Sequence, residues 1–334
     1  MPELRSDRLT DTWVIVAEER RGRPLEHRLR AERRADAGPC PFCPGQEAMT
    51  PPELLALRDR GAADGPGWRV RVVPNKWPAL GPLGNPVPLG FALRSMAGVG
   101  AHEVVVDTPA HDARPRDVSA AQWGEVALAL QERMRALRAD PRVAYVLAFK
   151  NQGPASGASL AHPHTQLLAM PLVPDRVARE ARALEEHARL SQRCLLEDVL
   201  QEELDAKARV IEATDDVVLV CPWAARFPYE MLLAPRAHAP RFEEAPPAMA
   251  QAFGALLGRA LARLQGALEG SALESYHLAI HTAPARGQQE RFHWHAEVMP
   301  SLSFHAGFEK GTGMFLNHLG PERSAERLRG VALP

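Results

Sequence analysis

Short apolar and β-branched runs, each bounded by Pro, Gly, Asn or Asp, punctuate the first half of the chain in the pattern typical of β-strands. They predict strands at residues 13–17, 68–75, 102–108, 144–150 and 165–170. Between the third and fourth runs, apolar residues recur at helical spacing from Ser119, a helix-capping residue, to the Asp140-Pro141 break. This segment predicts a helix, and the Gly- and Pro-rich stretches 33–66 and 80–100 predict loops.

The second half has a similar plan. It opens with a long helix, predicted over residues 175–207 from leucines on one face and charged residues four apart. Strands are predicted at 208–213, 216–221, 229–234, 276–282 and 292–299. A helix over about 247–268 separates the third and fourth of these, and a last short helix is predicted at PERSAERLRG, residues 321–330.

Each half therefore places strands around one helix and ends in a strand with an H-x-H sequence. This parallel suggests a duplication, with a division into residues 1–172 and 173–334. Because strands and helices do not alternate regularly, the pattern predicts an α+β fold of mainly antiparallel β-sheet flanked by helices.

Composition narrows the class of protein. The 334 residues carry a net charge of −1, which argues against a protein that mainly binds nucleic acid or an anionic membrane. No apolar run approaches the roughly 20 residues of a membrane helix, the first residues do not read as a signal peptide, and the four cysteines do not make a disulfide framework. We therefore expect a soluble, cytoplasmic globular protein, a class in which most members of this size are enzymes.

The strongest chemical signal is FKNQGPASGASLAHPHTQ, residues 149–166. His162, His164 and Gln166 alternate, so an extended chain places them on one face. The small residues of the loop before them are Gly153, Gly157 and Ser159. Backbone amides in such a loop can approach phosphate oxygens closely, and a neutral imidazole is a good nucleophile at pH 7. The pattern favours chemistry at phosphorus, and the alternative is a surface strand with incidental histidines.

Cys40 and Cys43 form a C-x2-C pair in a Pro- and Gly-rich loop. The spacing suits a zinc site or a thiol redox pair, and the loop context favours metal. Zinc needs two more ligands, for which His102 and His162 are the natural candidates. The alternative is a pair of cysteines without a ligand.

A second set of histidines lies near the C-terminus, where His293 and His295 alternate on a predicted strand and follow His281. Glu180, on the long predicted helix, can complete a metal site of one carboxylate and three histidines. Alone, this set has low specificity, because His293 and His295 can equally be partly buried strand residues that are hydrogen-bonded to neighbours.

Taken in order, the segments resemble the galactose-1-phosphate uridylyltransferases, a branch of the histidine-triad superfamily. The resemblance runs nearly end to end, through ELRSDRLTDTWVIVAEERRGRP, CPFCPGQE, VVPNKWPAL, GAHEVVVDTPAH, the HPHTQ segment, CPWAARFPYEMLLAPRAH and FHWHAEVMP. It implies two histidine-triad-like halves and a homodimer in which each active site is completed by the partner subunit.

The resemblance implies that His164 is the nucleophile that takes up the nucleotidyl group. Gln166 stands where the hydrolytic relatives carry a third histidine. A neutral amide donates hydrogen bonds to phosphoryl oxygens but does not protonate a leaving group, which favours a transferase over a hydrolase. The implied mechanism is ping-pong: UMP passes from UDP-glucose to His164 and then to galactose 1-phosphate.

The metal and substrate residues are also implied by the resemblance. A structural zinc is expected on Cys40, Cys43, His102 and His162. A second metal, iron or zinc, which some members of the family lack, is expected on Glu180, His281, His293 and His295. Substrate contacts are expected from Asn75, Asn151, Gly157, Ser159, Glu309 and Asn317, and from two arginines of the neighbouring subunit, Arg20 and Arg23.

Two departures from the best-known members affect substrate choice. The loop before HPHTQ lacks their Cys-Ser-Asn-Pro run, and Phe308 replaces a tyrosine, so the chain looks closer to a subgroup that includes ADP-glucose phosphorylases. The leading hypothesis is a hexose-1-phosphate uridylyltransferase, and the alternative is a related transferase or phosphorylase with another base or acceptor. A third hypothesis, a nucleotide-binding protein without turnover, is disfavoured by the intact HPHTQ segment.

Overall fold

The computed structural model describes residues 1–22, 38–269, 275–287, 289–302 and 306–333. Within these residues, ten strands form one antiparallel sheet in the order β3-β4-β5-β7-β6-β11-β12-β10-β9-β8. The strands of the first half are β3 (Leu55–Arg58), β4 (Trp68–Pro74), β5 (Ala101–Val106), β6 (Tyr145–Gln152) and β7 (His164–Met170). Those of the second half are β8 (Val210–Ala213), β9 (Val217–Val220), β10 (Met231–Pro235), β11 (Tyr276–His281) and β12 (His295–Pro300).

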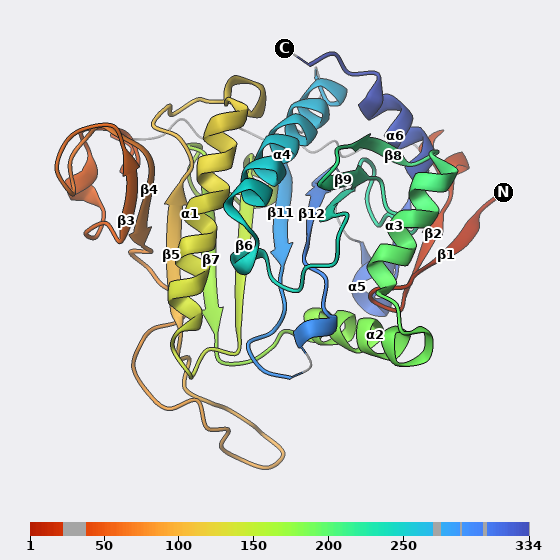
Figure 1. Ribbon diagram of the computed structural model, residues 1–334, viewed down its shortest axis with the longest axis horizontal. Coiled ribbons are helices and arrows are strands. Elements are labelled where there is room, and N and C mark those ends of the chain that lie inside the picture. Colours follow the sequence, from red (N-terminus) through yellow and green to blue (C-terminus); the bar gives the residue numbers. More distant parts are fainter. Residues whose placement is uncertain (23–37, 270–274, 288, 303–305, 334) are drawn as a thin grey trace.

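The strand order reads the same from both edges of the sheet. β6 and β11 pair at the centre, and each is followed outward by the H-x-H strand of its own half, β7 or β12. The predicted fold class is confirmed, since the sheet is antiparallel and helices flank it (Figure 1). The division at residues 172 and 173 stays a prediction, because both halves share this continuous sheet.

One face of the sheet is covered by α1 (Ala120–Arg138) and α4 (Pro247–Ala267), which lie side by side (Figure 1). The predicted cap of α1 is confirmed, because the Ser119 side chain accepts a hydrogen bond from the Gln122 amide at 3.1 Å. The two helices approach closely at Gly254, where a Cβ atom would lie 2.4 Å from the Trp123 carbonyl oxygen. Their apolar sides and the inner face of the sheet form the largest core of the molecule.

The opposite face carries α2 (Asp175–Ser191) and α3 (Leu195–Ala206) over the second half of the sheet. A single helix over 175–207 was predicted, and that prediction is wrong in one respect. Gln192 has a left-handed φ of 61°, which ends α2 and turns the chain so that α3 packs Leu196 and Leu200 against the sheet. The helical periodicity is correct on both sides of the break.

A small sheet of three strands packs beside the second half and was only partly predicted. It contains β1 (Glu3–Asp7), β2 (Thr12–Val16) and β13 (Phe315–Asn317), with β13 parallel to β2. α5 (Gly307–Thr312) precedes β13, and α6 (Pro321–Arg329) follows it, as predicted. β1, β3, β13 and α5 were not predicted, because each is too short to establish a hydrophobic period.

Short 3₁₀ helices occupy several connections: η1 (Glu18–Gly22), η2 (Glu47–Met49), η3 (Pro115–Asp117), η4 (Pro154–Ser156), η5 (Phe242–Glu244) and η6 (Gln289–Arg291). Among the described residues, none of the helices combines the length and the apolar character needed to cross a membrane.

Candidate active site

His164, the predicted nucleophile, begins β7 on the face away from α1 and α4, because the alternate residues Leu167 and Ala169 are buried against those helices. Its Nδ1 lies 2.8 Å from the His162 carbonyl oxygen. The nitrogen facing a carbonyl must carry the proton, so Nε2 keeps its lone pair. The residue is 5% exposed, and burial together with the positive charge of Lys150 lowers the pKa of His164. The imidazole is therefore neutral and nucleophilic at pH 7.

A buried ion pair holds the backbone on both sides of the nucleophile. Lys150 Nζ lies 2.8 Å from Asp107 Oδ2 and donates to the His164 carbonyl oxygen at 3.1 Å. The Asp107 amide donates to the Pro163 carbonyl oxygen at 3.1 Å, and the Thr165 hydroxyl also donates to Asp107. The pair joins β5, β6 and β7 at the point where His164 begins. Sequence analysis missed it, although a lysine ending the apolar run YVLAFK was its signal.

Gln166 lies on the same face as His164, and its carboxamide contacts His102. Gln166 Oε1 is 2.9 Å from His102 Nε2, which is also 3.3 Å from Asn75 Nδ2. His102 was predicted to bind zinc, and the structure contradicts this. In the register of β5 and β7, His102 is paired with Leu168, four residues beyond His164, whereas the cysteine loop meets the chain at His162, before β7 begins.

Cys40, Cys43 and His162 come together as predicted, and the fourth member of the group is His111. The four potential ligand atoms lie within 4.8 Å of one another. His162 Nδ1 is 3.8 Å from Cys40 Sγ and 3.7 Å from Cys43 Sγ, and His111 Nδ1 is 3.3 Å from Cys43 Sγ. Tetrahedral zinc would separate sulfur and nitrogen ligands by about 3.5 Å, so the group fits zinc. The signal for His111 was present in DTPAH, but spacing alone did not rank it above His102.

The candidate metal group and the nucleophile are physically connected. His162 Nε2 donates to the Thr108 carbonyl oxygen at 2.8 Å, which turns Nδ1 toward the cysteines. Phe42, between the two cysteines, has its ring centroid 6.1 Å from that of His162 and 5.4 Å from that of His164. Any movement of the cysteine loop would therefore reach the nucleophile through Phe42.

Three of the four residues predicted for a second metal meet in the second half of the sheet. Glu180, His281 and His295 are buried and have their potential ligand atoms within 4.8 Å of one another. Glu180 Oε2 lies 2.7 Å from His281 Nδ1, and Arg176 Nε lies 3.3 Å from Glu180 Oε1. Burial disfavours a charged His281, but the Glu180 carboxylate outweighs it and raises the pKa of that imidazole.

His293, the fourth predicted residue, is not part of this group. Its Nδ1 lies 3.3 Å from Cys194 Sγ, and its Nε2 lies 3.1 Å from the Pro235 carbonyl oxygen. The second contact repeats, in the other half, the bond from His162 to Thr108. His293 was predicted to lie on a strand with His295, but β12 begins at His295. His293 therefore lies before the strand, and its side chain contacts Cys194 and Pro235 and not the group of Glu180, His281 and His295.

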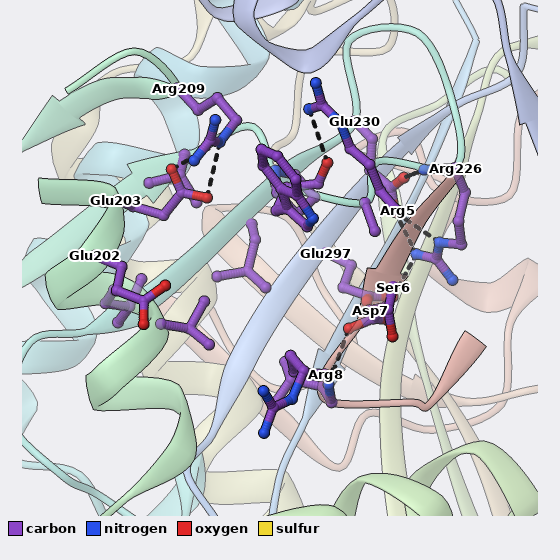
Figure 2. A pocket seen from close by; sticks show the side chains of 18 of the residues that line it. Arg5, Ser6, Asp7, Arg8, Glu202, Glu203, Arg209, Arg226, Glu230 and Glu297 are labelled. Carbon is purple, nitrogen blue, oxygen red and sulfur yellow. Dashed lines mark hydrogen bonds and ion pairs between the residues drawn. The ribbon is translucent and has the colours of Figure 1, made fainter. Parts of the chain in front are cut away.

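In the second half, His295 occupies the position that corresponds to His164. Its side chain is fully buried and does not reach solvent. Glu297 stands where the first half has Gln166, and it accepts from Arg226 at 2.9 Å. Figure 2 shows Glu297, Arg226 and Glu230 in the wall of a cavity of about 490 Å³, beside Arg5 of β1. The ionic side chains of this wall neutralise one another.

The predicted contacts on β6 and in the loop after it lie in the segment that leads to His164. Asn151 of β6 shares the sheet face of the nucleophile, and its Oδ1 lies 2.8 Å from Nδ1 of His277, its register partner on β11. Gly157, which ends η4, has a left-handed φ of 73°, and Ser159 is exposed two residues later. His277 was not among the predicted site residues.

The other predicted contacts lie elsewhere in the same chain. Arg20 is exposed in η1, and Arg23 lies outside the described residues. Glu309, on α5, accepts a hydrogen bond from the Ala306 amide at 2.9 Å. Asn317, on β13, is fully buried and donates to the Ala225 carbonyl oxygen at 2.9 Å, so its side chain is committed to the fold. Figure 1 places α5 and the small sheet beside the second half of the large sheet, whereas β7 lies in the first half.

Comparison with known proteins yields one family and a consistent set of relatives. The family "Galactose-1-phosphate uridyl transferase" matches with its N-terminal domain at residues 85–174 and its C-terminal domain at residues 180–330. ADP-glucose phosphorylase of Arabidopsis thaliana is 31% identical, with 99% of this chain and 93% of the relative covered. Galactose-1-phosphate uridylyltransferase of Thermotoga maritima is 28% identical, with 98% of each covered.

Solved structures agree. The crystal structure of the Arabidopsis thaliana ADP-glucose phosphorylase with bound ADP-glucose matches with a TM-score of 0.84 and 29% identity, over all of both chains. A structure described as uridylyltransferase matches with a TM-score of 0.76 and 26% identity, over 98% of this chain and 97% of the other.

Proposed function

Because the chain belongs to the galactose-1-phosphate uridyl transferase family, we propose that it transfers a nucleoside monophosphate from a nucleotide sugar to a phosphate acceptor through a covalent intermediate on His164. The observation that carries the proposal is the hydrogen bond from His164 Nδ1 to the His162 carbonyl oxygen, 2.8 Å long. It leaves Nε2 unprotonated and available to attack phosphorus.

The proposed reaction has two displacements that balance without a general base. In the first, the Nε2 lone pair forms a bond to the α-phosphorus, and the bond from phosphorus to the bridging oxygen breaks, releasing sugar 1-phosphate. In the second, an ionised phosphate oxygen of the acceptor attacks the same phosphorus and the P–N bond breaks, which restores neutral His164. Charge on the phosphoryl oxygens is stabilised by the Gln166 amide and by backbone amides of the loop at Gly157 and Ser159.

For the donor and acceptor, we propose ADP-glucose and inorganic phosphate first. The relative named ADP-glucose phosphorylase is 31% identical, and its structure holds ADP-glucose. UDP-glucose with galactose 1-phosphate, the pair expected from the sequence, is the second candidate, supported by the uridylyltransferase relative at 28% identity over nearly the whole chain.

We propose zinc for the group of Cys40, Cys43, His111 and His162, whose distances and donor types fit it. Four protein ligands would close the coordination sphere, so the ion's role is structural. When bound, it would anchor the cysteine loop to the first residue of the H-P-H sequence and thereby hold His164 in place.

We propose that two copies of the chain form a homodimer with shared sites. Glu309 on α5 and Arg20 in η1, which follows β2, belong to the part of the fold beside the second half of the sheet, whereas His164 begins β7 in the first half, so we propose that they reach the site of a partner (Figure 1). The loop between β4 and β5 supports association, because its side chains Trp77, Leu83, Phe91 and Leu93 are between 80% and 94% exposed. Apolar groups gathered on one segment in this way are typical of a protein–protein contact.

The test is intact-mass spectrometry after incubation with ADP-glucose or UDP-glucose separately. The wild-type protein is expected to gain one AMP residue from the first or one UMP residue from the second, and His164→Asn is expected to gain neither. An adenylyl increment supports the first donor, and a uridylyl increment supports the second. A wild-type protein that gains nothing from either, or a His164→Asn variant that is still labelled, would overturn the proposal.

A further inference from the structure

We propose that His102 is a positioning residue that fixes the Gln166 carboxamide with its NH₂ group toward the reacting phosphoryl group. The inference rests on the proposed function and adds to it a residue whose predicted role was metal binding. His102 belongs to β5, and its imidazole lies within hydrogen-bond distance of Gln166 and close to Asn75, two residues of the candidate site.

The backbone decides which ring nitrogen of His102 carries the proton. The Ala79 amide donates to Nδ1 at 3.3 Å, so Nδ1 provides a lone pair and the hydrogen of the neutral ring is on Nε2. Nε2–H can then donate only to an acceptor, and Gln166 Oε1 lies 2.9 Å away. Asn75 Nδ2, at 3.3 Å from the same nitrogen, is a donor and does not compete for this hydrogen.

The orientation of Gln166 follows from this tautomer. With Oε1 committed to His102, both N–H groups of the carboxamide remain for phosphoryl oxygens. A carboxamide turned by half a rotation would instead present its oxygen to the anionic phosphoryl group, which is repulsive. Donors that are oriented before the substrate binds stabilise developing charge without a cost of reorganisation at the moment of reaction.

The strand register explains why the His102 imidazole contacts Gln166 and is not part of the candidate metal group. Val104 is paired with Gln166, and His102, two residues earlier on β5, projects from the same face. Phe149 closes the other side of the ring, with centroids 6.4 Å apart. The His102 ring therefore lies beside β7, within reach of the side-chain carboxamide of Gln166.

Three substitutions of His102 distinguish a positioning role from a general loss of structure. The Nε2 atom of glutamine extends about as far from the backbone as the imidazole Nε2, whereas asparagine reaches only the position of Nδ1 and leucine has no donor. We expect His102→Leu and His102→Asn to slow single-turnover nucleotidylation of His164 about tenfold or more, which is less than the roughly 100- to 1000-fold seen when a donor to a developing oxyanion is itself removed. We expect His102→Gln to retain the rate within about threefold, and substrate half-saturation to change less than the rate in all three.

The matched control is His111→Asn, with zinc content measured in every variant. His111→Asn is expected to lose the metal, and the His102 variants are expected to keep it. Wild-type labelling rates in His102→Leu, slow labelling in all three variants alike, or loss of zinc from the His102 variants would each overturn the positioning role and leave the proposed function standing. A wild-type protein that is not labelled by either nucleotide sugar overturns the proposed function, and the role of His102 falls with it.

Discussion

In the proposed mechanism, His164 is the nucleophile of the candidate site and Gln166 is its neutral hydrogen-bond donor. The imidazole owes its reactivity to one backbone hydrogen bond and to burial, which keep Nε2 unprotonated. The carboxamide two residues later can donate hydrogen bonds that stabilise charge. It is not titratable, so it neither protonates a leaving group nor takes a proton from water. In the proposed mechanism, this pairing would let a nucleotidyl-histidine persist until an acceptor arrives.

Replacing Gln166 by histidine tests this assignment of roles. A titratable ring at this position can protonate a leaving group and activate water, so we expect Gln166→His to release free nucleoside monophosphate from nucleotide sugar in the absence of acceptor. The rate is expected to rise about 100-fold over wild type, the lower end of general acid–base contributions. Gln166→Asn is the control without a titratable group, and equal hydrolysis by the two variants would contradict the role given to the amide.

For single residues, the sequence predicted which side chains belong to the candidate site better than it predicted which of them contact one another. The H-P-H-T-Q alternation was enough to place His164 and Gln166 on one face of β7, whereas His162 lies before the strand and contacts the cysteines. It was not enough to choose between His102 and His111, nine positions apart in the chain, because the choice depends on the register of β5 against β7. Register is set by the whole sheet, which a single motif does not reveal.

Among the elements, the paired helices α1 and α4 and the cysteine loop have the largest effect on the site. α1 and α4 pack the sheet from the face opposite His164, so their contact determines how rigidly β7 is held. The cysteine loop lies on the nucleophile's side and touches it through Phe42. The two elements stabilise the same strands from opposite faces.

The close contact between α1 and α4 predicts that a larger residue at Gly254 destabilises the protein. An alanine Cβ there would meet backbone atoms of Trp123 and Gly124 at less than 3 Å, so we expect Gly254→Ala to lower the free energy of unfolding by about 1–3 kcal/mol, as overpacking does. Urea unfolding measures the change. Gly266→Ala on the same helix is the control, because its Cβ meets only the movable side chain of Val331. Equal stability of the two variants would contradict close packing at Gly254.

The cysteine loop predicts a structural role for the metal. Cys43→Ser, or chelation of the wild-type protein, is expected to remove zinc and to lower the thermal midpoint, because the loop, His111 and His162 lose their common ligand. Calorimetry and metal analysis follow the two effects. A wild-type protein purified without zinc, or a melting temperature that chelation leaves unchanged, would count against the assignment.

Most of the longer elements were predictable, and the reasons for the exceptions are local. Ser119 and the Asp140-Pro141 break bounded α1 correctly, because capping and proline chemistry act within one turn. The division of the 175–207 helix at Gln192 was not predicted, since a left-handed glutamine carries no sequence signal of the kind a glycine gives. Packing of α3 on the sheet determines that break.

Viewed as a whole, the molecule consists of two similar halves of which only the first carries the candidate nucleophile. In the second half the corresponding histidine is buried and the corresponding amide is a carboxylate held by arginines. The small sheet combines β1 and β2 from the start of the chain with β13 from the second half, and it packs beside the second half together with α5, on which Glu309 lies. In the proposed homodimer, the partner would bring these parts to the nucleophile.

The exposed apolar side chains of the loop between β4 and β5 predict the surface through which the proposed homodimer associates. Phe91 is 94% exposed, and Leu93 is 91% exposed, so we expect the double variant Phe91→Ser/Leu93→Ser to weaken association and shift the mass measured by light scattering toward a single chain. Leu190→Ser on α2 removes a similarly exposed leucine, 70% exposed, away from this loop and is the control. A wild-type protein that is monomeric at working concentration, or a double variant that dimerises as tightly as wild type, would exclude this loop as the contact.

The most direct measurement of the central claim is peptide mapping of the protein quenched during reaction with nucleotide sugar. The account predicts a nucleoside monophosphate joined through phosphorus to the His164 side chain, in the peptide that contains HPHTQ, and its loss when an acceptor phosphate is added. A nucleotidyl group on any other residue, or turnover with no bound nucleotide at any time, would contradict it.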